Sequence, residues 1–153
     1  MQKGDILGLV MMTAGVALLA AFFIFADEAP ELSYAPVDVG GGSLEVPSGQ
    51  TSLTEVSVNA NLARAGFVTI HRSVGPAPGP VMGTSSLLPE GEQTSIIKIN
   101  GEMIPGYTYI ALLHVDNGDG VFVATDDMPV QVDGTVVRVD FDAAGESILL
   151  PTE

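Results

Sequence analysis

The segment Tyr107-Thr-Tyr-Ile-Ala-Leu-Leu-His-Val115 carries the clearest structural signal in this chain. Its apolar character is nearly continuous, and it holds the aromatic and β-branched residues that favour strands. A short apolar run of this kind is typical of a strand that is covered on both faces. The segment therefore predicts a buried strand at the centre of a sheet.

The sequence on either side predicts further, shorter strands. From Thr54 to Ala60 apolar and polar residues alternate, which is the pattern of a half-buried strand. The dipeptide Asp133-Gly134 is a strong signal for a two-residue hairpin. The other predicted strands are 66–72, 81–87, 94–100, 121–124, 129–132 and 135–141, with 44–46 as a candidate first edge strand. With glycine and proline turns between them, these segments predict an all-β domain, an antiparallel β-sandwich of about seven or eight strands.

A long apolar run near the amino terminus predicts a membrane anchor. The 21 residues from Ile6 to Ala26 contain no charge, and as a helix they rise about 31 Å, the thickness of the hydrocarbon core. A cleaved signal peptide is the alternative, but its apolar region is usually about 7–15 residues long. Lys3 precedes the run and acidic residues follow it, so we expect a single-pass helix with the carboxyl-terminal domain on the extracytoplasmic side.

Three segments follow from these assignments. Residues 1–26 form the predicted anchor helix, residues 27–50 a proline- and glycine-rich linker, and residues 51–150 the extracytoplasmic β-sandwich. The lipid bilayer is the partner expected for Ile6 to Ala26. Small residues at Thr13, Ala17 and Ala21 would also allow this helix to self-associate or to pack against membrane-protein partners.

The charge and the composition exclude several classes of function. Nineteen acidic residues against five basic ones give a formal net charge of −14, which repels nucleic acid. The absence of cysteine excludes disulfides and thiolate metal sites. No GxSxG elbow, dinucleotide-binding loop or P-loop occurs in the chain. We therefore expect a protein that is not an enzyme and that does not bind nucleic acid.

The two histidines, His71 and His114, each lie near the end of a predicted strand. A pair of imidazoles could contribute to a zinc site, but two ligands do not complete one. Neither HxH nor HxxxH spacing occurs. Two structural histidines, each hydrogen-bonded to the backbone, are the favoured interpretation.

A loop rich in Asp, Asn and Gly follows the central strand. Carboxylate and amide oxygens that are close in sequence suit calcium, a hard cation with several oxygen ligands. The pattern does not match an EF-hand, because Val115 stands where the first Asp belongs and Asp126 replaces the final Glu. The same residue types are preferred in ordinary turns. Two interpretations stay open: an Asx-rich turn, or a calcium-type loop with ligands Asp116, Asn117, Asp119, Asp126 and Asp127.

The segment Tyr109-Ile-Ala-Leu-Leu-His-Val-Asp-Asn-Gly-Asp-Gly-Val-Phe122 also carries a resemblance to a known family. With the weaker motifs GFVTIH (66–71), VMGTS (81–85) and LPEG (88–91), it resembles a domain of unknown function in membrane-tethered surface proteins of haloarchaea and several uncultured bacterial lineages. The resemblance covers residues 51–142. It implies an extracytoplasmic β-domain, often attached to an anchor, and it brings no catalytic assignment with it.

These observations favour a membrane-anchored extracytoplasmic surface or interaction module. Two alternatives remain open. Lys3-Gly4 before the apolar run is similar to the processing site of a pilin-like filament subunit, although Leu9 stands where such subunits have a glutamate. The chain could otherwise be a small accessory subunit of a larger membrane complex.

Overall fold

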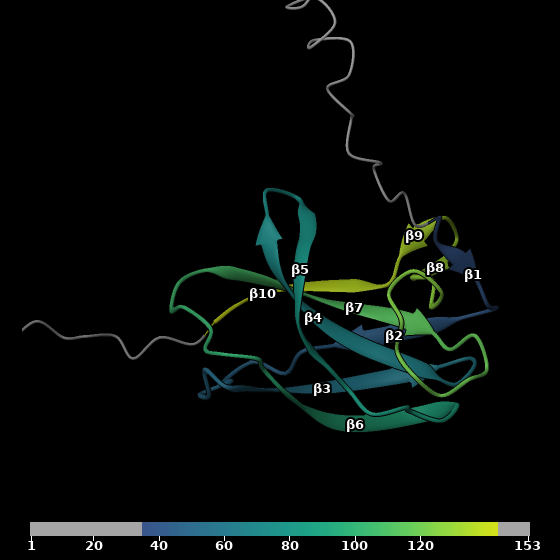
Figure 1. The fold of residues 1–153 in the computed structure, drawn as a ribbon, viewed down its shortest axis with the longest axis horizontal. Coiled ribbons are helices and arrows are strands. Elements are labelled where there is room, and N and C mark those ends of the chain that lie inside the picture. Colours follow the sequence, from purple (N-terminus) through teal and green to yellow (C-terminus); the bar gives the residue numbers. More distant parts are fainter. Residues whose placement is uncertain (1–34, 144–153) are drawn as a thin grey trace, which may run out of the picture. The chain divides into compact units, whose positions relative to one another are not determined.

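The strand predicted at the centre of a sheet is β7 (Thr108–Val115), in which seven of eight residues are buried. In the computed structural model, which describes residues 35–143, β7 pairs with β4 (Gly66–Val74) on one side and β10 (Arg138–Asp142) on the other. The strand β5 (Ala77–Thr84) completes a four-stranded antiparallel sheet of order β10-β7-β4-β5 (Figure 1).

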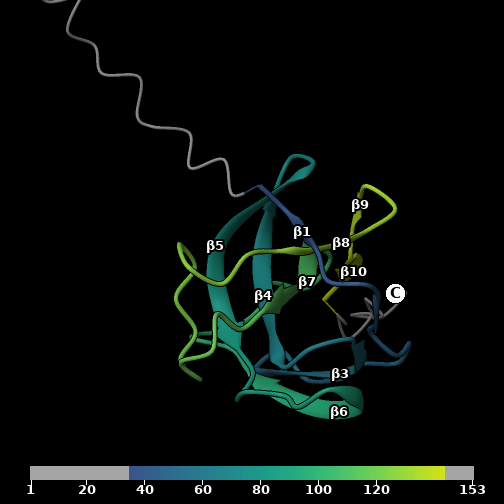
Figure 2. The same ribbon diagram turned by 90° about the vertical axis from the view of Figure 1, so that its right-hand side faces the viewer.

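Two three-stranded sheets complete the domain (Figures 1 and 2). The larger contains β2 (Gly42–Glu45), β3 (Glu55–Leu62) and β6 (Gly91–Lys98), all antiparallel, in the order β2-β3-β6. The smaller contains β1 (Val37–Asp38), β8 (Val130–Val132) and β9 (Thr135–Val136), and its β1–β8 pair is parallel. The hairpin from β8 to β9 turns at Asp133 and Gly134, as the sequence predicts.

The core lies between the β2-β3-β6 sheet and the four-stranded sheet. The alternation in β3 buries every second residue, so that Val56 and Val58 are fully buried while Glu55 is exposed. From the opposite sheet, Val68, Ile70 and Ala111 are also fully buried. Burial of this apolar surface is the main force that holds the two sheets together.

A glycine permits the close pairing of β4 with β7. A Cβ atom at Gly66 would lie 2.1 Å from the carbonyl oxygen of His114, so no larger residue fits without moving the backbone. The close approach fixes the register in which Phe67 faces His114.

The prediction of an all-β domain is confirmed: residues 35–143 form ten strands in three sheets and no helix. The predicted strand 121–124 is wrong, since these residues belong to a loop. Two strands, β1 and β2, lie within the predicted linker 27–50. No helix in the described part of the chain could span a bilayer, and the predicted anchor from Ile6 to Ala26 lies outside the described residues.

Candidate functional site

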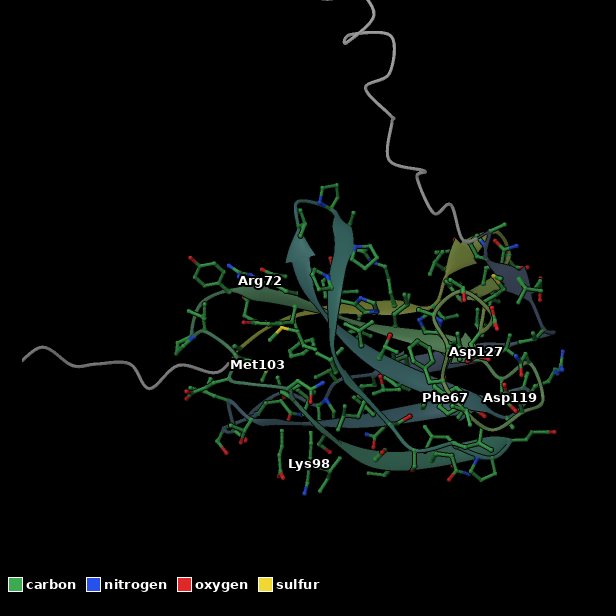
Figure 3. All side chains as sticks on the ribbon, viewed as in Figure 1. Phe67, Arg72, Lys98, Met103, Asp119 and Asp127 are labelled. Atoms are coloured by element: carbon green, nitrogen blue, oxygen red, sulfur yellow. The ribbon has the colours of Figure 1, made fainter. Side chains whose placement is uncertain are left out.

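From Gly66 to His71, the part of β4 that pairs with Ile110–Val115 of β7 is buried on both of its faces. One face belongs to the core, and the other carries Phe67, Thr69, His71, Ile110, Leu112 and His114, each at most 7% exposed. The loop from Asp116 to Pro129 folds against this second face, where the Phe122 ring makes edge contacts with Phe67 (centroids 5.6 Å apart) and His114 (5.2 Å). Figure 3 shows Phe67, Asp119 and Asp127 at the same end of the sheet. This loop and the face beneath it form the candidate site.

Short side-chain hydrogen bonds fold the first half of the loop. Oδ1 of Asp116 accepts from the backbone N–H of Gly120 at 3.0 Å. Oδ1 of Asn117 accepts from the N–H of Asp119 at 2.9 Å, and Oδ1 of Asp119 accepts from the N–H of Val121 at 2.8 Å. These are the local turns that Asp and Asn side chains favour, with the side-chain oxygen replacing a backbone acceptor.

Asp127 closes the loop from inside the protein. Its side chain is fully buried, with Oδ1 accepting from the N–H of Asn117 at 2.9 Å and Oδ2 accepting from the N–H of Val123 at 2.7 Å. Hydrogen bonds to an ionised oxygen are stronger than neutral ones, and a buried carboxylate is tolerated only when it is hydrogen-bonded in this way. Asp127 therefore ties the two ends of the loop together.

The five residues of the predicted calcium-type loop differ in how deeply the structure buries them. Asp116 and Asp127 are buried, whereas Asn117, Asp119 and Asp126 are exposed. Asp126 accepts a hydrogen bond from Oγ1 of Thr125 at 2.8 Å. Within residues 35–143, no group of three or more His, Cys, Asp or Glu side chains is arranged to hold a metal ion. A calcium-type loop stays a prediction, and each of its five residues has at least one side-chain oxygen that accepts a hydrogen bond from the protein.

The two histidines come together beneath the loop. Nδ1 of His71 donates to the carbonyl oxygen of Gly79 at 2.7 Å, and Nδ1 of His114 donates to the carbonyl oxygen of Asp127 at 2.8 Å. Both therefore make the backbone hydrogen bond expected of them from the sequence. Since Nδ1 carries the proton in each, Nε2 is the acceptor. Nε2 of His71 lies 2.7 Å from Oγ1 of Thr69, which donates to it.

Burial keeps both imidazoles neutral at pH 7. Desolvation lowers the pKa of His71, against the opposing effect of its hydrogen bond to Gly79. Desolvation also lowers the pKa of His114 to about 4, reinforced by the nearby His71 and opposed by the hydrogen bond and charge of Asp127.

The proximity of His71 and His114 is the feature that sequence reasoning missed. Forty-three residues separate them, and they meet only because β4 pairs with β7 in the register that places Phe67 opposite His114. Their ring centroids lie 6.4 Å apart. The signal that could have found them is their position in two neighbouring apolar strands, where a polar side chain must find partners.

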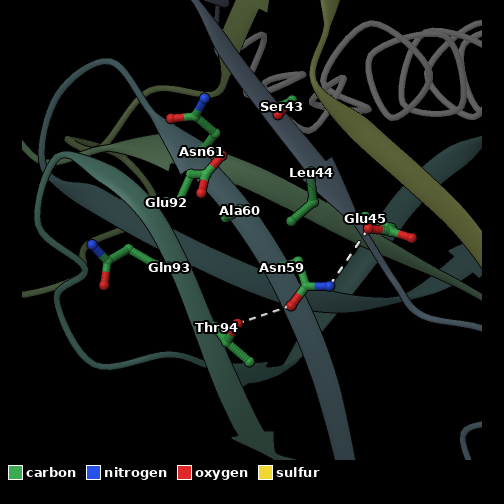
Figure 4. A pocket seen from close by; sticks show the side chains of 9 residues that line it. All are labelled: Ser43, Leu44, Glu45, Asn59, Ala60, Asn61, Glu92, Gln93 and Thr94. Carbon is green, nitrogen blue, oxygen red and sulfur yellow. Dashed lines mark hydrogen bonds between the residues drawn. The ribbon is translucent and has the colours of Figure 1, made fainter.

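A second feature lies on the solvent face of the β2-β3-β6 sheet. The register aligns two rows across this face, Ser43 with Asn61 and Glu92, and Glu45 with Asn59 and Thr94. Together with neighbouring residues they line an open hollow of about 570 Å³ (Figure 4). Asn59 bridges its row, accepting from Oγ1 of Thr94 at 3.0 Å and donating to Oε2 of Glu45 at 3.5 Å. We call these six residues the polar face.

The described residues thus define a small all-β domain with one covered histidine face and one open polar face. A family model matches residues 42–143, which include every strand from β2 to β10. The chain belongs to that family, which is described as a domain of unknown function (DUF7282). No curated protein and no solved structure matches the chain.

Proposed function

We propose that this chain is a membrane-anchored extracytoplasmic interaction module without catalytic activity. The anchor would be the uncharged segment from Ile6 to Ala26, and the β-domain would present its polar face to an envelope component or to neighbouring copies. The polar face is the observation that supports this proposal most directly.

The side chains of the polar face suit reversible contact with a polar partner. Ser43, Asn61, Glu92 and Thr94 are exposed, and amides, hydroxyls and carboxylates together offer both donors and acceptors. Ile96, on the same strand as Thr94, is 65% exposed and adds an apolar contact beside the hollow. Interfaces of non-obligate complexes combine polar and apolar groups in this way.

An edge of the other sheet is less suited to a partner. Within residues 35–143 the strand β5 pairs with β4 alone in its sheet, and the carbonyl oxygen of Met82 already accepts from the N–H of Asn100 at 2.6 Å. Pro78 and Pro80 within β5 have no N–H to donate. A partner strand added at this edge would have backbone carbonyl oxygens without an N–H donor opposite the prolines. The geometry therefore favours contact through the polar face over extension of the sheet at β5.

The test is the size of the full chain after gentle solubilisation from membranes. We expect a species larger than the monomer with its detergent, and we expect Asn59→Arg combined with Asn61→Arg to reduce it to the monomer. Asn117→Arg, which places one arginine on the exposed loop after β7, outside the polar face, is the control for added charge. A monomeric wild type, or a large species that the polar-face variant leaves intact, would contradict contact through this face.

The anchor is tested separately by intact-mass measurement of the same preparation. A mature species that begins near Asp27 would exclude the anchor, and loss of Met1 to Gly4 alone would favour the filament-subunit alternative. Protease treatment of intact cells should remove the β-domain if it lies outside.

A further inference from the structure

The hairpin between β4 and β5 stands out from the four-stranded sheet. The last β4 residue that pairs with β7 is Arg72, so beyond it, among residues 35–143, β4 pairs with β5 alone. The register shifts on either side of His71 bend the two strands at this point, as β-bulges do. Figure 1 shows the hairpin rising from the sheet on the side away from β3 and β6. We call residues 73–80 the hairpin tip.

The hairpin tip is apolar and exposed in a strongly acidic protein. Its sequence is Ser-Val-Gly-Pro-Ala-Pro-Gly-Pro, and no charged residue occurs from Ser73 to Pro89, although the chain has a net charge of −14. Val74 is 61% exposed, and Gly75 to Pro78 are exposed as well. Apolar surface gathered at one exposed place marks a contact with a partner or a membrane.

The polar groups of the hairpin tip are few, and several of them have partners within the domain. Three of its eight residues are prolines, which have no N–H. The hydroxyl of Ser73 donates to the carbonyl oxygen of Gly75 at 2.7 Å. Nη1 of Arg138 donates to the carbonyl oxygen of Pro76 at 2.9 Å. Because an unpaired polar group is costly to move out of water, this arrangement lowers the cost of moving the tip into an apolar medium.

An aromatic ring and two arginines lie at the base of the hairpin tip. The guanidinium carbon of Arg72 lies over the ring of Tyr107, 5.1 Å from its centroid, and Tyr107 is 48% exposed. Arg138 forms an ion pair with Asp140 at 2.7 Å, so its charge is compensated. Tyrosine and arginine beside an apolar projection are typical of the boundary between lipid and water, because each has an apolar body and a polar end.

The hairpin tip lies on the side of the domain where the described chain begins. In Figures 1 and 2 the start of β1 and the tip both lie on the side of the four-stranded sheet away from β3 and β6. The residues from Ala26 to Ala35 span at most about 30 Å when fully extended. An anchor that ends at Ala26 therefore holds the start of β1 within this distance of the bilayer.

We propose that the hairpin tip inserts into the lipid surface of the membrane that holds the chain, with Val74 at the acyl boundary and Tyr107 among the headgroups. The inference rests on the proposed function, because the anchor supplies the proximity. A contact through few apolar residues is weak between separate molecules. A short tether makes the second contact intramolecular, with an effective concentration of about millimolar. The polar face then points away from the membrane.

A lipid surface fits the hairpin tip better than a protein partner does. Proteins recognise an extended segment through backbone hydrogen bonds, and the prolines remove donors that such pairing uses. They recognise a projecting segment through a large side chain that fills a pocket, and the tip has no side chain larger than that of Val74. Lipid requires neither of these features.

The test uses the full chain reconstituted in phosphatidylcholine vesicles. Because the chain contains no cysteine, Val74→Cys provides a single attachment point for a spin label. Ile96→Cys on β6 is the matched control, since Ile96 is 65% exposed and Val74 is 61% exposed. Oxygen partitions into the bilayer, whereas a nickel chelate stays in water. We expect the label at Val74 to be relaxed mainly by oxygen and the label at Ile96 mainly by the chelate.

A charge at the hairpin tip should abolish the contact. A carboxylate must lose its water to enter the bilayer, so Val74→Asp should return a spin label at Ala77→Cys to the aqueous phase. The substitution is at an exposed position, and Ile96→Asp is its control, which should leave the Ala77 label in lipid. Added salt should change neither result, because the contact is apolar.

Flotation of the vesicles distinguishes the two ways in which the proposal can fail. A chain that does not float with the vesicles would overturn the proposed anchor, and this inference with it. A chain that floats, but whose Val74 label meets the nickel chelate as freely as the Ile96 label, would overturn the insertion and leave the anchor in place. Magnetic broadening between Val74 labels on neighbouring chains would show a second copy at the tip, which would also overturn the contact with lipid.

Discussion

Asp127 is hydrogen-bonded to His114 through its main chain, with its carbonyl oxygen 2.8 Å from Nδ1 of the imidazole. Its buried carboxylate meanwhile holds the backbone N–H groups of Asn117 and Val123. One residue thus builds the loop over the second face of the β4–β7 pair and also sets the orientation of a histidine beneath it. The folding of the loop and the geometry of the histidine pair are coupled through Asp127.

Replacing Asp127 should therefore destabilise the domain more than replacing any other acid in the loop. Asp127→Ala leaves two backbone donors without partners, and each hydrogen bond to a charged group contributes about 1.5–3 kcal/mol, so we expect a loss of about 3 kcal/mol or more. Asp127→Asn keeps one acceptor and should lose about half of that. Asp119→Ala removes only an exposed turn contact and serves as the control, with an expected loss below about 1 kcal/mol. Chemical denaturation measures all three, and equal losses for Asp127→Ala and Asp119→Ala would contradict the assigned role.

A substitution at Gly66, where β4 pairs with β7, should destabilise the domain as much as Asp127→Ala. A methyl group at this position would meet the carbonyl oxygen of His114 at 2.1 Å, so the strands must separate. We expect Gly66→Ala to cost about 3 kcal/mol or more, the range of severe packing defects. Gly49→Ala is the control, because a Cβ there has nothing within 4 Å and meets only the strain of φ +86°, about 1 kcal/mol. A Gly66→Ala domain as stable as the control would show that the strands can move apart freely.

The strands with a regular pattern of apolar residues were predictable from the sequence. The alternation from Thr54 to Ala60 corresponds to β3, and the apolar run ending at Val115 corresponds to β7, because periodic burial is a local property. The error at 121–124 has a physical reason. Phe122 lies in a loop, but its ring packs against Phe67 and His114. An apolar residue that is buried from a loop produces the same local sequence pattern as an apolar residue in a strand.

The site was predictable only in part. The sequence located the acidic loop and expected backbone hydrogen bonds for the histidines, since both depend on residue type. The sequence does not distinguish Asp127, which is fully buried, from Asp126, which is exposed. That difference, like the meeting of His71 with His114, depends on how distant strands pair.

The two interpretations of the acidic loop can be separated by a thermal melt. Asp116, Asn117 and Asp119 each accept a backbone N–H, an arrangement that holds the turn without a cation. We therefore expect the same Tm in millimolar calcium and in chelator, and little change for Asp119→Asn. A calcium-dependent rise in Tm that Asp119→Asn abolishes would instead support a calcium-type loop, because binding to the folded state stabilises it.

Acid should destabilise the domain through His114. Burial lowers its pKa in the folded state from 6.5 to about 4, so between these values the unfolded chain binds a proton that the folded chain does not. The stabilisation is fully present above pH 6.5 and is lost as the pH falls through about 4. The interval corresponds to about 3 kcal/mol at most, at 1.36 kcal/mol per pH unit. The lowered pKa of His71 acts in the same direction.

Carboxylates also titrate in this range, so the contribution of His114 must be isolated by difference. His114→Asn keeps a donor for the carbonyl of Asp127 but cannot be protonated near pH 4–6, and it should lose less stability than the wild type between pH 7 and pH 4, by about 3 kcal/mol. Urea denaturation at several pH values gives the two curves. The nuclear magnetic resonance shift of the imidazole reports the titration directly, with an expected midpoint near 4. Parallel stability curves and a midpoint near 6.5 would mean that the loop opens and lets water reach His114.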